Sequence, residues 1–132
     1  MSDRLVYLDS SAFVKLVIPE DESRALAAYL RRWSVAVSAT LLRTEALRAA
    51  ARHSARALRD TRLALRDVAF IELSRDVLDQ AGIVAPTSVR SLDAIHLATA
   101  VSLGDDLGEL VTYDVRMAAA AGACGLPVAS PS

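Results

Sequence analysis

The sequence predicts an α/β sandwich with a mainly parallel, five-stranded sheet, and three observations lead to this prediction. Short apolar segments, each bounded by polar or turn residues, have the form of buried strands. Segments of helical periodicity lie between them, so that strand and helix alternate along the chain. Such alternation is typical of parallel sheets covered by helices. The length of 132 residues suits one domain, which we expect to span residues 1–132.

The expected strands are residues 5–8, 35–38, 70–73, 109–113 and 126–129. The first expected helix, residues 11–17, stops before Pro19, and a second follows at residues 22–32. A long helical pattern at residues 40–68 is expected to break near His53 and Ser54. The remaining helices are expected at residues 75–82, 91–103 and 115–121, the last followed by Gly122.

Composition excludes several classes of protein. Hydrophobic residues make up 53% of the chain and charged residues 23%, which argues against disorder. No uncharged apolar run approaches the roughly 18–20 residues of a membrane span, and an acid at Asp9 interrupts any signal-peptide pattern. The single cysteine, Cys124, cannot form an intrachain disulfide, which fits the reducing cytoplasm, and we expect it to be buried.

Four acidic residues stand out by their positions. Asp9 and Asp114 follow the first and fourth expected strands, and the carboxyl ends of parallel strands are where sites form. Each acid alone has an ordinary explanation: Asp9, Asp93 and Asp114 can stabilise helix starts, and Glu45 can pair with Arg48. As a set, they are an oxygen-only group suited to Mg²⁺ or Mn²⁺, the ions that support phosphodiester cleavage. His53 and His96 lie far apart in sequence, so no histidine cluster for zinc is evident.

The segments around these acids resemble the PIN-domain family of ribonucleases, especially the toxins of VapBC toxin–antitoxin modules. Residues 5–15 (LVYLDSSAFVK) are similar to the family's opening segment, residues 91–100 (SLDAIHLATA) to its third acidic motif and residues 110–117 (LVTYDVRM) to its fourth. Glu45, in LLRTEA at residues 41–46, matches the second motif by its place and helical context. The motifs occur in the family's order and cover nearly the whole chain.

The resemblance implies a three-layer α/β/α sandwich and endonucleolytic RNA cleavage that depends on Mg²⁺ or on Mn²⁺ in its place. It implies that Asp9, Glu45, Asp93 and Asp114 are the catalytic and metal-binding residues. The hydroxyls of Ser10 and Thr112 are expected to hold carboxylates or waters beside them, unless they serve only as turn or cap hydroxyls. His96 lies on the same helix face as Asp93, and we expect it to pack or orient and not to act as a base. A cognate antitoxin and a homodimer are the implied protein partners.

The net charge of −1 gives no overall signal for nucleic acid, but the middle of the chain is basic. Arg48, Arg52, Arg56, Arg59, Arg62 and Arg66 are spaced three or four residues apart. On one continuous helix they would lie within an arc of about 120°. This stripe is either a phosphate-binding track leading towards Glu45 or a solvated face, and an antitoxin could use it too. If the helix breaks at His53, the last four, Arg56, Arg59, Arg62 and Arg66, still form a stripe.

Three other classes of protein are alternatives to a ribonuclease. A receiver-like signalling domain would need a paired acid next to Asp9 and a lysine late in the chain, whereas Ser10 follows Asp9 and Lys15 is the last lysine. A catalytically inactive PIN-like binding module conflicts with the presence of all four acids. A DNA-directed nuclease would use the same metal chemistry, so only the family resemblance favours RNA.

Overall fold

The computed structural model describes residues 2–132 and has at its centre a five-stranded sheet in which every pairing is parallel. The strand order is β3-β2-β1-β4-β5. The strands are β1 Ser2–Leu8, β2 Trp33–Ala39, β3 Val68–Ile71, β4 Leu107–Val111 and β5 Val128–Ala129. The chain adds β2 and β3 on one side of β1 and then crosses to add β4 and β5 on the other. The boundary between β1 and β4 is therefore the point where the winding direction reverses.

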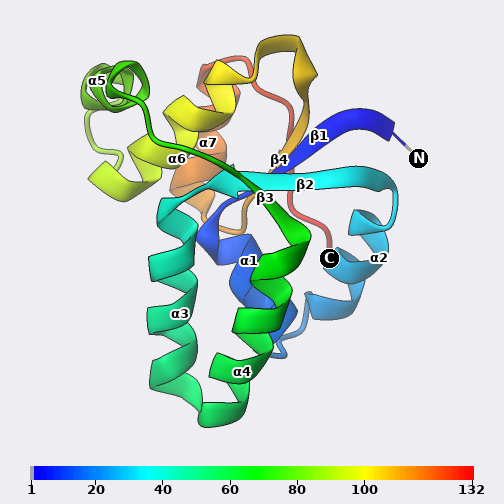
Figure 1. The fold of residues 1–132 in the computed structure, drawn as a ribbon. Coiled ribbons are helices and arrows are strands. Elements are labelled where there is room, and N and C mark those ends of the chain that lie inside the picture. Colours follow the sequence, from blue (N-terminus) through cyan, green and yellow to red (C-terminus); the bar gives the residue numbers. More distant parts are fainter. Residues whose placement is uncertain (1) are drawn as a thin grey trace.

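Helices cover both faces of the sheet, as expected for a three-layer α/β/α sandwich (Figure 1). One layer consists of α1 Ser10–Val17, α2 Ser23–Leu30, α3 Leu41–His53 and α4 Ala55–Ala64. The other contains α6 Ser91–Ser102 and α7 Val115–Ala123, with α5 Arg75–Ile83 packed against α6. Among residues 2–132, no helix has the length and apolar character needed to cross a membrane.

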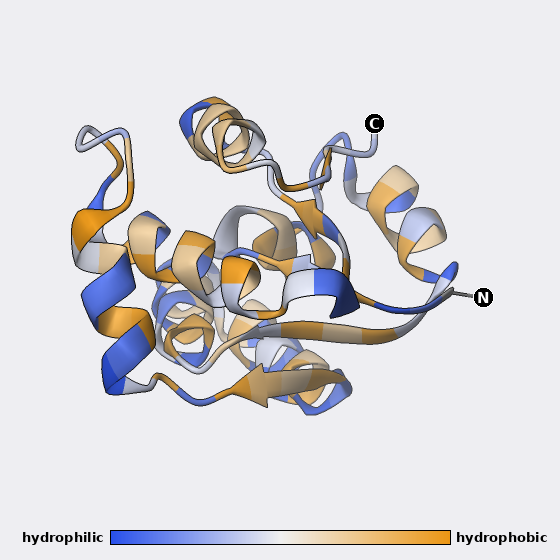
Figure 2. Cartoon of the chain, turned by 90° about the horizontal axis from the view of Figure 1, so that it is seen from above, coloured by the Kyte–Doolittle hydropathy of each residue, from blue (hydrophilic) through white to orange (hydrophobic). Residues whose placement is uncertain are grey.

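The two cores follow from the alternation of side chains along the buried strands. Val6 and Leu8 of β1 face the α1–α4 layer, where Phe13 and Leu42 are fully buried. Tyr7 points to the opposite face. There it packs in a cluster with buried residues of β4, α6 and α7: Leu97, Ala100, Leu107, Leu110, Met117, Ala120 and Ala121. The strands are mostly hydrophobic along their length, whereas the helices mix hydrophobic and hydrophilic residues (Figure 2). Burial on both faces thus explains why the strands read as short apolar runs.

The structure has the helix break at the predicted place, Ser54. Ser54 adopts an extended backbone (φ −169°, ψ 162°) between α3 and α4, and its Oγ accepts a hydrogen bond from the Ala57 N–H at 2.9 Å. Ser54 therefore ends one helix and caps the next. As a result, α3 and α4 form a hairpin and the chain turns back on itself (Figure 1).

Two strand positions were predicted about two residues too late. β3 ends at Ile71 because its neighbour β2 ends at Ala39, which leaves residues 72 and 73 without a strand to pair with. β4 ends at Val111 because the next residues bond elsewhere: the Tyr113 N–H donates to Ser11 Oγ at 2.9 Å. Leu73 and Tyr113 both suit a strand, so the pattern alone did not reveal these ends.

The expectation for Cys124 was wrong. The cysteine is exposed, although Met117, Ala120 and Ala121 on the preceding turns of α7 are buried. The helix ends at Ala123, and Gly125 turns the chain with a positive φ of 79°. The turn carries Cys124 off the face that its helical spacing would have buried.

Candidate active site

Asp9 lies directly after β1 and is the most firmly held of the four acids. Its Oδ1 accepts hydrogen bonds from Ser11 Oγ at 2.7 Å and from the Ala12 N–H at 3.0 Å. Its Oδ2 accepts one from Thr112 Oγ1 at 2.5 Å. The residue is 3% exposed, and burial raises the pKa of Asp9 above its usual value while these hydrogen bonds oppose the shift. Asp9 thus caps α1 and is fixed at the switch point of the sheet.

The hydroxyl groups of Ser11 and Thr112 connect the ends of β1 and β4. Thr112 Oγ1 donates to Asp9 and accepts from the Asp114 N–H at 3.1 Å, so one side chain positions two acids. Ser11 Oγ donates to Asp9 and accepts from the Tyr113 N–H. The sequence pointed to Ser10 for this role, but the serine on the Asp9 carboxylate is Ser11. Because Asp9 caps the helix, the hydroxyl two residues later turns back towards it.

Asp114 follows β4 and caps α7. Its Oδ1 accepts from the backbone N–H groups of Arg116 at 2.8 Å and Met117 at 3.2 Å. Both contacts engage the same oxygen, so Oδ2 is the one that can face a ligand.

Asp93 lies in the first turn of α6 and is partly buried. Burial raises the pKa of Asp93, and the charges of Asp114, Asp9 and Glu45 raise it further, while His96 opposes them. This mutual repulsion is the electrostatic sign that four acids distant in sequence share one region.

Glu45 projects from the second turn of α3, and its partner is His96 rather than Arg48. Oε1 of Glu45 lies 2.7 Å from Nε2 of His96, and Nδ1 of His96 lies 2.6 Å from the hydroxyl of Tyr7. His96 is fully buried, and the Glu45 side chain is 17% exposed. The histidine was expected to pack or orient; the structure shows it tied at both ring nitrogens.

A surface hollow of about 330 Å³ adjoins two of the acids. Asp93 and Asp114 line it together with two exposed arginines, Arg90 and Arg116. Sequence reasoning overlooked these arginines because they do not belong to a run. The signal was their closeness to the acids: Arg90 precedes Asp93 by one helical turn, and Arg116 follows Asp114 by two residues.

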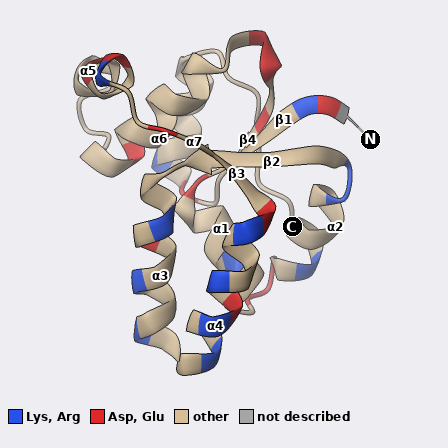
Figure 3. Ribbon diagram, in the orientation of Figure 1, with Lys and Arg blue, Asp and Glu red and all other residues tan. Residues whose placement is uncertain are grey.

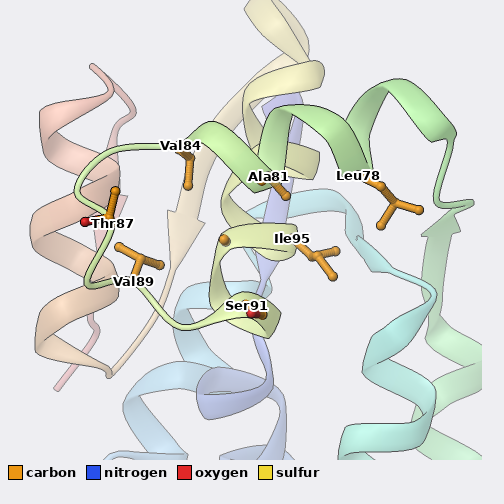
Figure 4. A pocket seen from close by; sticks show the side chains of 9 residues that line it. Leu78, Ala81, Val84, Thr87, Val89, Ser91 and Ile95 are labelled. Atoms are coloured by element: carbon orange, nitrogen blue, oxygen red, sulfur yellow. The ribbon is translucent and has the colours of Figure 1, made fainter.

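A second hollow, of about 290 Å³, lies between α5 and α6 (Figure 4). Leu78 and Ala81 of α5 and Ser91 and Ile95 of α6 line it. These α6 positions are offset around the helix from Asp93, and Val89, just before α6, lines both hollows.

These side chains suit a hydrated metal ion better than a closed metal cage. Within residues 2–132, no three His, Cys, Asp or Glu side chains are already gathered as such a cage. Mg²⁺ seldom uses one, since it commonly binds through one or two carboxylates and keeps several waters. An oxygen-only set in which Asp93 and Asp114 line one hollow fits an ion of this kind.

The arginine stripe does not form the continuous track that one long helix would have produced. Arg48 and Arg52 lie on α3, Arg56, Arg59 and Arg62 on α4, and Arg66 in the 3₁₀ turn Leu65–Asp67. All six are exposed, and basic residues occur along both helices of the hairpin (Figure 3). The 3₁₀ turn leads directly into the start of β3, so the stripe ends at the sheet edge opposite the acids. Arg48 lies about one turn after Glu45 on α3, so the α3 part of the stripe leads towards Glu45 and the α4 part is a separate track.

Fold and candidate site together define a class of protein. It is a small α/β protein with a parallel sheet, and acidic side chains gather at the sheet edge where β1 and β4 end. Comparison with known proteins gives the family. The model of the PIN domain matches residues 6–123. The chain is 48% identical to Ribonuclease VapC46 of Mycobacterium tuberculosis, with 96% of this chain and 98% of that protein covered. It is 35% identical to Ribonuclease VapC47 of the same species, with 96% and 97% covered. The chain belongs to the PIN-domain family.

Solved structures share the fold at low sequence identity. The crystal structure of Mycobacterium tuberculosis VapC20, a Sarcin-Ricin loop cleaving toxin, superposes with a TM-score of 0.72 at 18% identity and covers 96% of this chain and 99% of that one. A toxin–antitoxin complex from Klebsiella pneumoniae gives 0.70 at 23% identity, with 96% and 98% covered. At these identities the likeness establishes the three-layer fold.

Proposed function

We propose that this protein is a metal-dependent endoribonuclease and the toxin of a type II toxin–antitoxin module, with residues 1–132 acting as one nuclease domain. The observation that carries the proposal is the acidic site at the switch point, with Asp9 held by three hydrogen bonds. The relatives named Ribonuclease VapC46 and VapC47, matched over nearly their whole length, support RNA as the substrate. Its substrate, cellular RNA, places the activity in the cytoplasm.

Asp9, Glu45, Asp93 and Asp114 are the residues that would hold Mg²⁺, or Mn²⁺ in its place, and orient the attacking water. A bound divalent ion lowers the pKa of a water molecule and stabilises charge on the phosphate. Asp9 offers a carboxylate that cannot rotate, because Ser11, Ala12 and Thr112 hold both of its oxygens. Glu45 and Asp114 each have one oxygen engaged by the protein, and the other can bind a ligand. In the hydrolysis, water gives its oxygen to phosphorus and the P–O bond to the leaving sugar oxygen breaks.

Arginines bind the RNA phosphates in this proposal. Arg90 and Arg116 border the hollow that Asp93 and Asp114 line, so they are placed to contact phosphates next to the cleaved bond. The stripe Arg56, Arg59, Arg62 and Arg66 lies farther out and would contact flanking phosphates. Arg56 is engaged only loosely, with its Nε 3.9 Å from Asp60 Oδ2 on the surface.

The proposed protein partner is a small cognate antitoxin. Two of the structural neighbours are VapBC complexes, from Rickettsia felis and Haemophilus influenzae, and a third is the Klebsiella pneumoniae toxin–antitoxin complex. An acidic region attracts a cation, so an Arg or Lys of the antitoxin would approach it and compete with metal. A homodimer is the other proposed assembly, and light scattering of the purified protein tests it.

RNA cleavage by the purified, antitoxin-free protein tests the proposal. Single-stranded RNA should be cut internally in Mg²⁺ or Mn²⁺, cutting should stop in EDTA, and Asp9→Asn should be inactive under all conditions. Single-stranded DNA of the same sequence, assayed in parallel, distinguishes a DNA-directed nuclease. Cleavage that persists in EDTA and in the Asp9→Asn protein would point to a contaminant. No cleavage together with antitoxin binding would make the chain an inactive binding module.

A further inference from the structure

A buried chain of polar contacts connects the centre of the sheet to the acidic site. Tyr7 of β1 and His96 of α6 are both fully buried, and their rings meet edge to face at a centroid distance of 5.7 Å. The Tyr7 hydroxyl contacts Nδ1 of His96 at 2.6 Å, and Nε2 of His96 contacts Oε1 of Glu45 at 2.7 Å. Glu45 is the end of this chain nearest to solvent.

The donor and acceptor of each hydrogen bond between Tyr7, His96 and Glu45 can be assigned by starting from the buried Tyr7 hydroxyl. The Tyr7 oxygen accepts a hydrogen bond from the Ala39 N–H at 3.1 Å. Burial raises the pKa of Tyr7 well above its usual value, so the phenol stays protonated and its O–H can donate a hydrogen bond to Nδ1 of His96. A neutral imidazole that accepts at Nδ1 carries its hydrogen on Nε2. His96 therefore donates to Oε1 of Glu45.

This arrangement fixes Glu45 from the side opposite its own helix. A glutamate side chain has three rotatable bonds, and ordering it costs side-chain entropy. His96 cannot move, because its ring is buried and bonded at both nitrogens. With Oε1 held, Oε2 is the oxygen left for a metal ion or a water molecule. α6 carries Asp93 itself and, one turn later, His96, which holds Glu45. This one helix therefore sets the spacing between Asp93 and Glu45.

We propose that His96, with its tautomer set by Tyr7, is a positioning residue that holds the Glu45 carboxylate for metal binding and catalysis. This inference rests on the proposed nuclease function. Partners of this kind, one contact removed from a metal, typically contribute 10–100-fold to metal affinity or activity. A histidine that serves only to fill the core would contribute to stability alone.

Two substitutions at His96 test the contributions of its two ring nitrogens separately. In His96→Gln the side-chain amide can reach the place of Nε2 and donate to Glu45. In His96→Asn the shorter amide reaches only the place of Nδ1 and leaves Glu45 unheld. Tyr7→Phe keeps the ring and removes the proton that sets the tautomer. Ser102→Ala is the control, because it removes a hydrogen bond within α6, to the Thr99 carbonyl, and leaves the contacts between Tyr7, His96 and Glu45 unchanged.

Three measurements are made on each protein: the Mn²⁺ dissociation constant from the free Mn²⁺ signal in electron paramagnetic resonance, kcat and KM for RNA, and the melting temperature in EDTA. We expect His96→Asn to lose about 10–100-fold in Mn²⁺ affinity or kcat with little change in KM. His96→Gln should recover most of that loss, Tyr7→Phe should show a smaller loss of the same kind, and Ser102→Ala should match wild type. In metal-free wild type, ¹⁵N spectra should show the His96 hydrogen on Nε2.

Equal Mn²⁺ affinity and kcat in wild type, His96→Asn and Tyr7→Phe would overturn the inference, as would a hydrogen on Nδ1. Equal losses in His96→Gln and His96→Asn that follow their melting temperatures would also overturn it, since that is the behaviour of a core residue. If the wild-type protein cleaves no RNA, the nuclease proposal fails, whereas Mn²⁺ affinity and the ¹⁵N spectra still decide the role of His96.

Discussion

At the scale of single residues, two of the four candidate site acids also stabilise the starts of helices. Asp9 and Asp114 cap α1 and α7, which is the ordinary use of an aspartate before a helix. Capping engages only part of a carboxylate, since two oxygens together offer about four acceptor positions. In Asp114 both cap contacts reach Oδ1, and Oδ2 stays available. A capping role therefore does not argue against a metal-binding role at the same residue.

Asp93→Asn tests the acidic site through stability as well as activity. The pKa of Asp93 is raised in the folded protein, so the folded state binds that proton more tightly than the unfolded chain does. The resulting stabilisation is full below about pH 3.9 and is lost as pH rises through the folded pKa. Near neutral pH the metal-free wild type is therefore penalised, and the variant, which has no charge there, is not. We expect the variant in EDTA to melt at or above wild type, with a difference that grows as pH rises.

The same pair of proteins should differ in their response to metal. Mn²⁺ binds the folded state only, so it should raise the melting temperature of wild type by mass action and raise that of Asp93→Asn much less. The variant should also lose RNA cleavage. Melting curves in EDTA and in Mn²⁺ check both points. A variant with the full Mn²⁺ response and full cleavage would show that Asp93 merely begins a helix.

The sequence predicted that the four acids share one region, but it did not predict the contacts that hold them. Asp9, Glu45, Asp93 and Asp114 stand at positions that strand ends and motifs mark. Ser11 and Thr112, by contrast, meet across residues that are far apart in the chain, and so do Tyr7 and His96. Adjacent hydroxyls such as Ser10 and Ser11 look alike in sequence, because only the turn after β1 decides which one faces Asp9.

At the scale of elements, a side chain of β2 reaches across β1 to contact β4. Trp33 begins β2, and its ring lies against the backbone of Gly108 in β4. A Cβ atom at position 108 would lie 2.1 Å from Cζ3 and 2.3 Å from Cη2 of that ring. The glycine is therefore needed for close approach rather than for its backbone freedom.

Gly108→Ala should destabilise the protein by about 1–3 kcal/mol, because the added methyl forces the Trp33 ring out of its place. Gly122→Ala is the matched control: it adds the same methyl in α7, where nothing lies within 4 Å of the new atom. It should stabilise the helix by roughly 0.5–1 kcal/mol. Urea denaturation of the three proteins gives the comparison. Equal stability of Gly108→Ala and wild type would show that the tryptophan moves aside freely.

Element types followed from periodicity, and the helix break expected near His53 and Ser54 lies at Ser54. The ends of β3 and β4 did not follow, because a strand ends where its neighbour or its hydrogen-bond partners end. That information lies in β2 and in Ser11, not in the strand's own residues.

At the scale of the whole molecule, parallel topology gathers the site. The switch between β1 and β4 brings the residues after both strands to one edge, and the hydrogen bond from Thr112 to Asp9 joins them there. The fold class could be predicted because strand–helix alternation admits few arrangements. The division of the arginine stripe into two parts could not, since it depends on the hairpin that folds α4 back along α3.

The distribution of arginines gives a final prediction about RNA affinity. Removing one arginine that binds a phosphate should make the slope of log affinity against log salt less negative by about 0.7. In EDTA, so that no RNA is cut, Arg90→Gln/Arg116→Gln should therefore flatten the slope by about 1.4. Arg59→Gln/Arg62→Gln on α4 should do the same if flanking phosphates reach the stripe. The control, Arg24→Gln/Arg31→Gln on and after α2, changes net charge equally and should leave the slope as in wild type.

Filter binding at several salt concentrations gives the four slopes. Replacing the arginines beside Asp93 and Asp114 should also raise KM for cleavage, because these side chains hold the phosphates next to the reacting bond. If the α4 pair behaves like the control, the stripe is a solvated face or an antitoxin surface. If the Arg90 and Arg116 pair behaves like the control, RNA reaches the acids from another side, and the hollow they share with Asp93 and Asp114 is not its path.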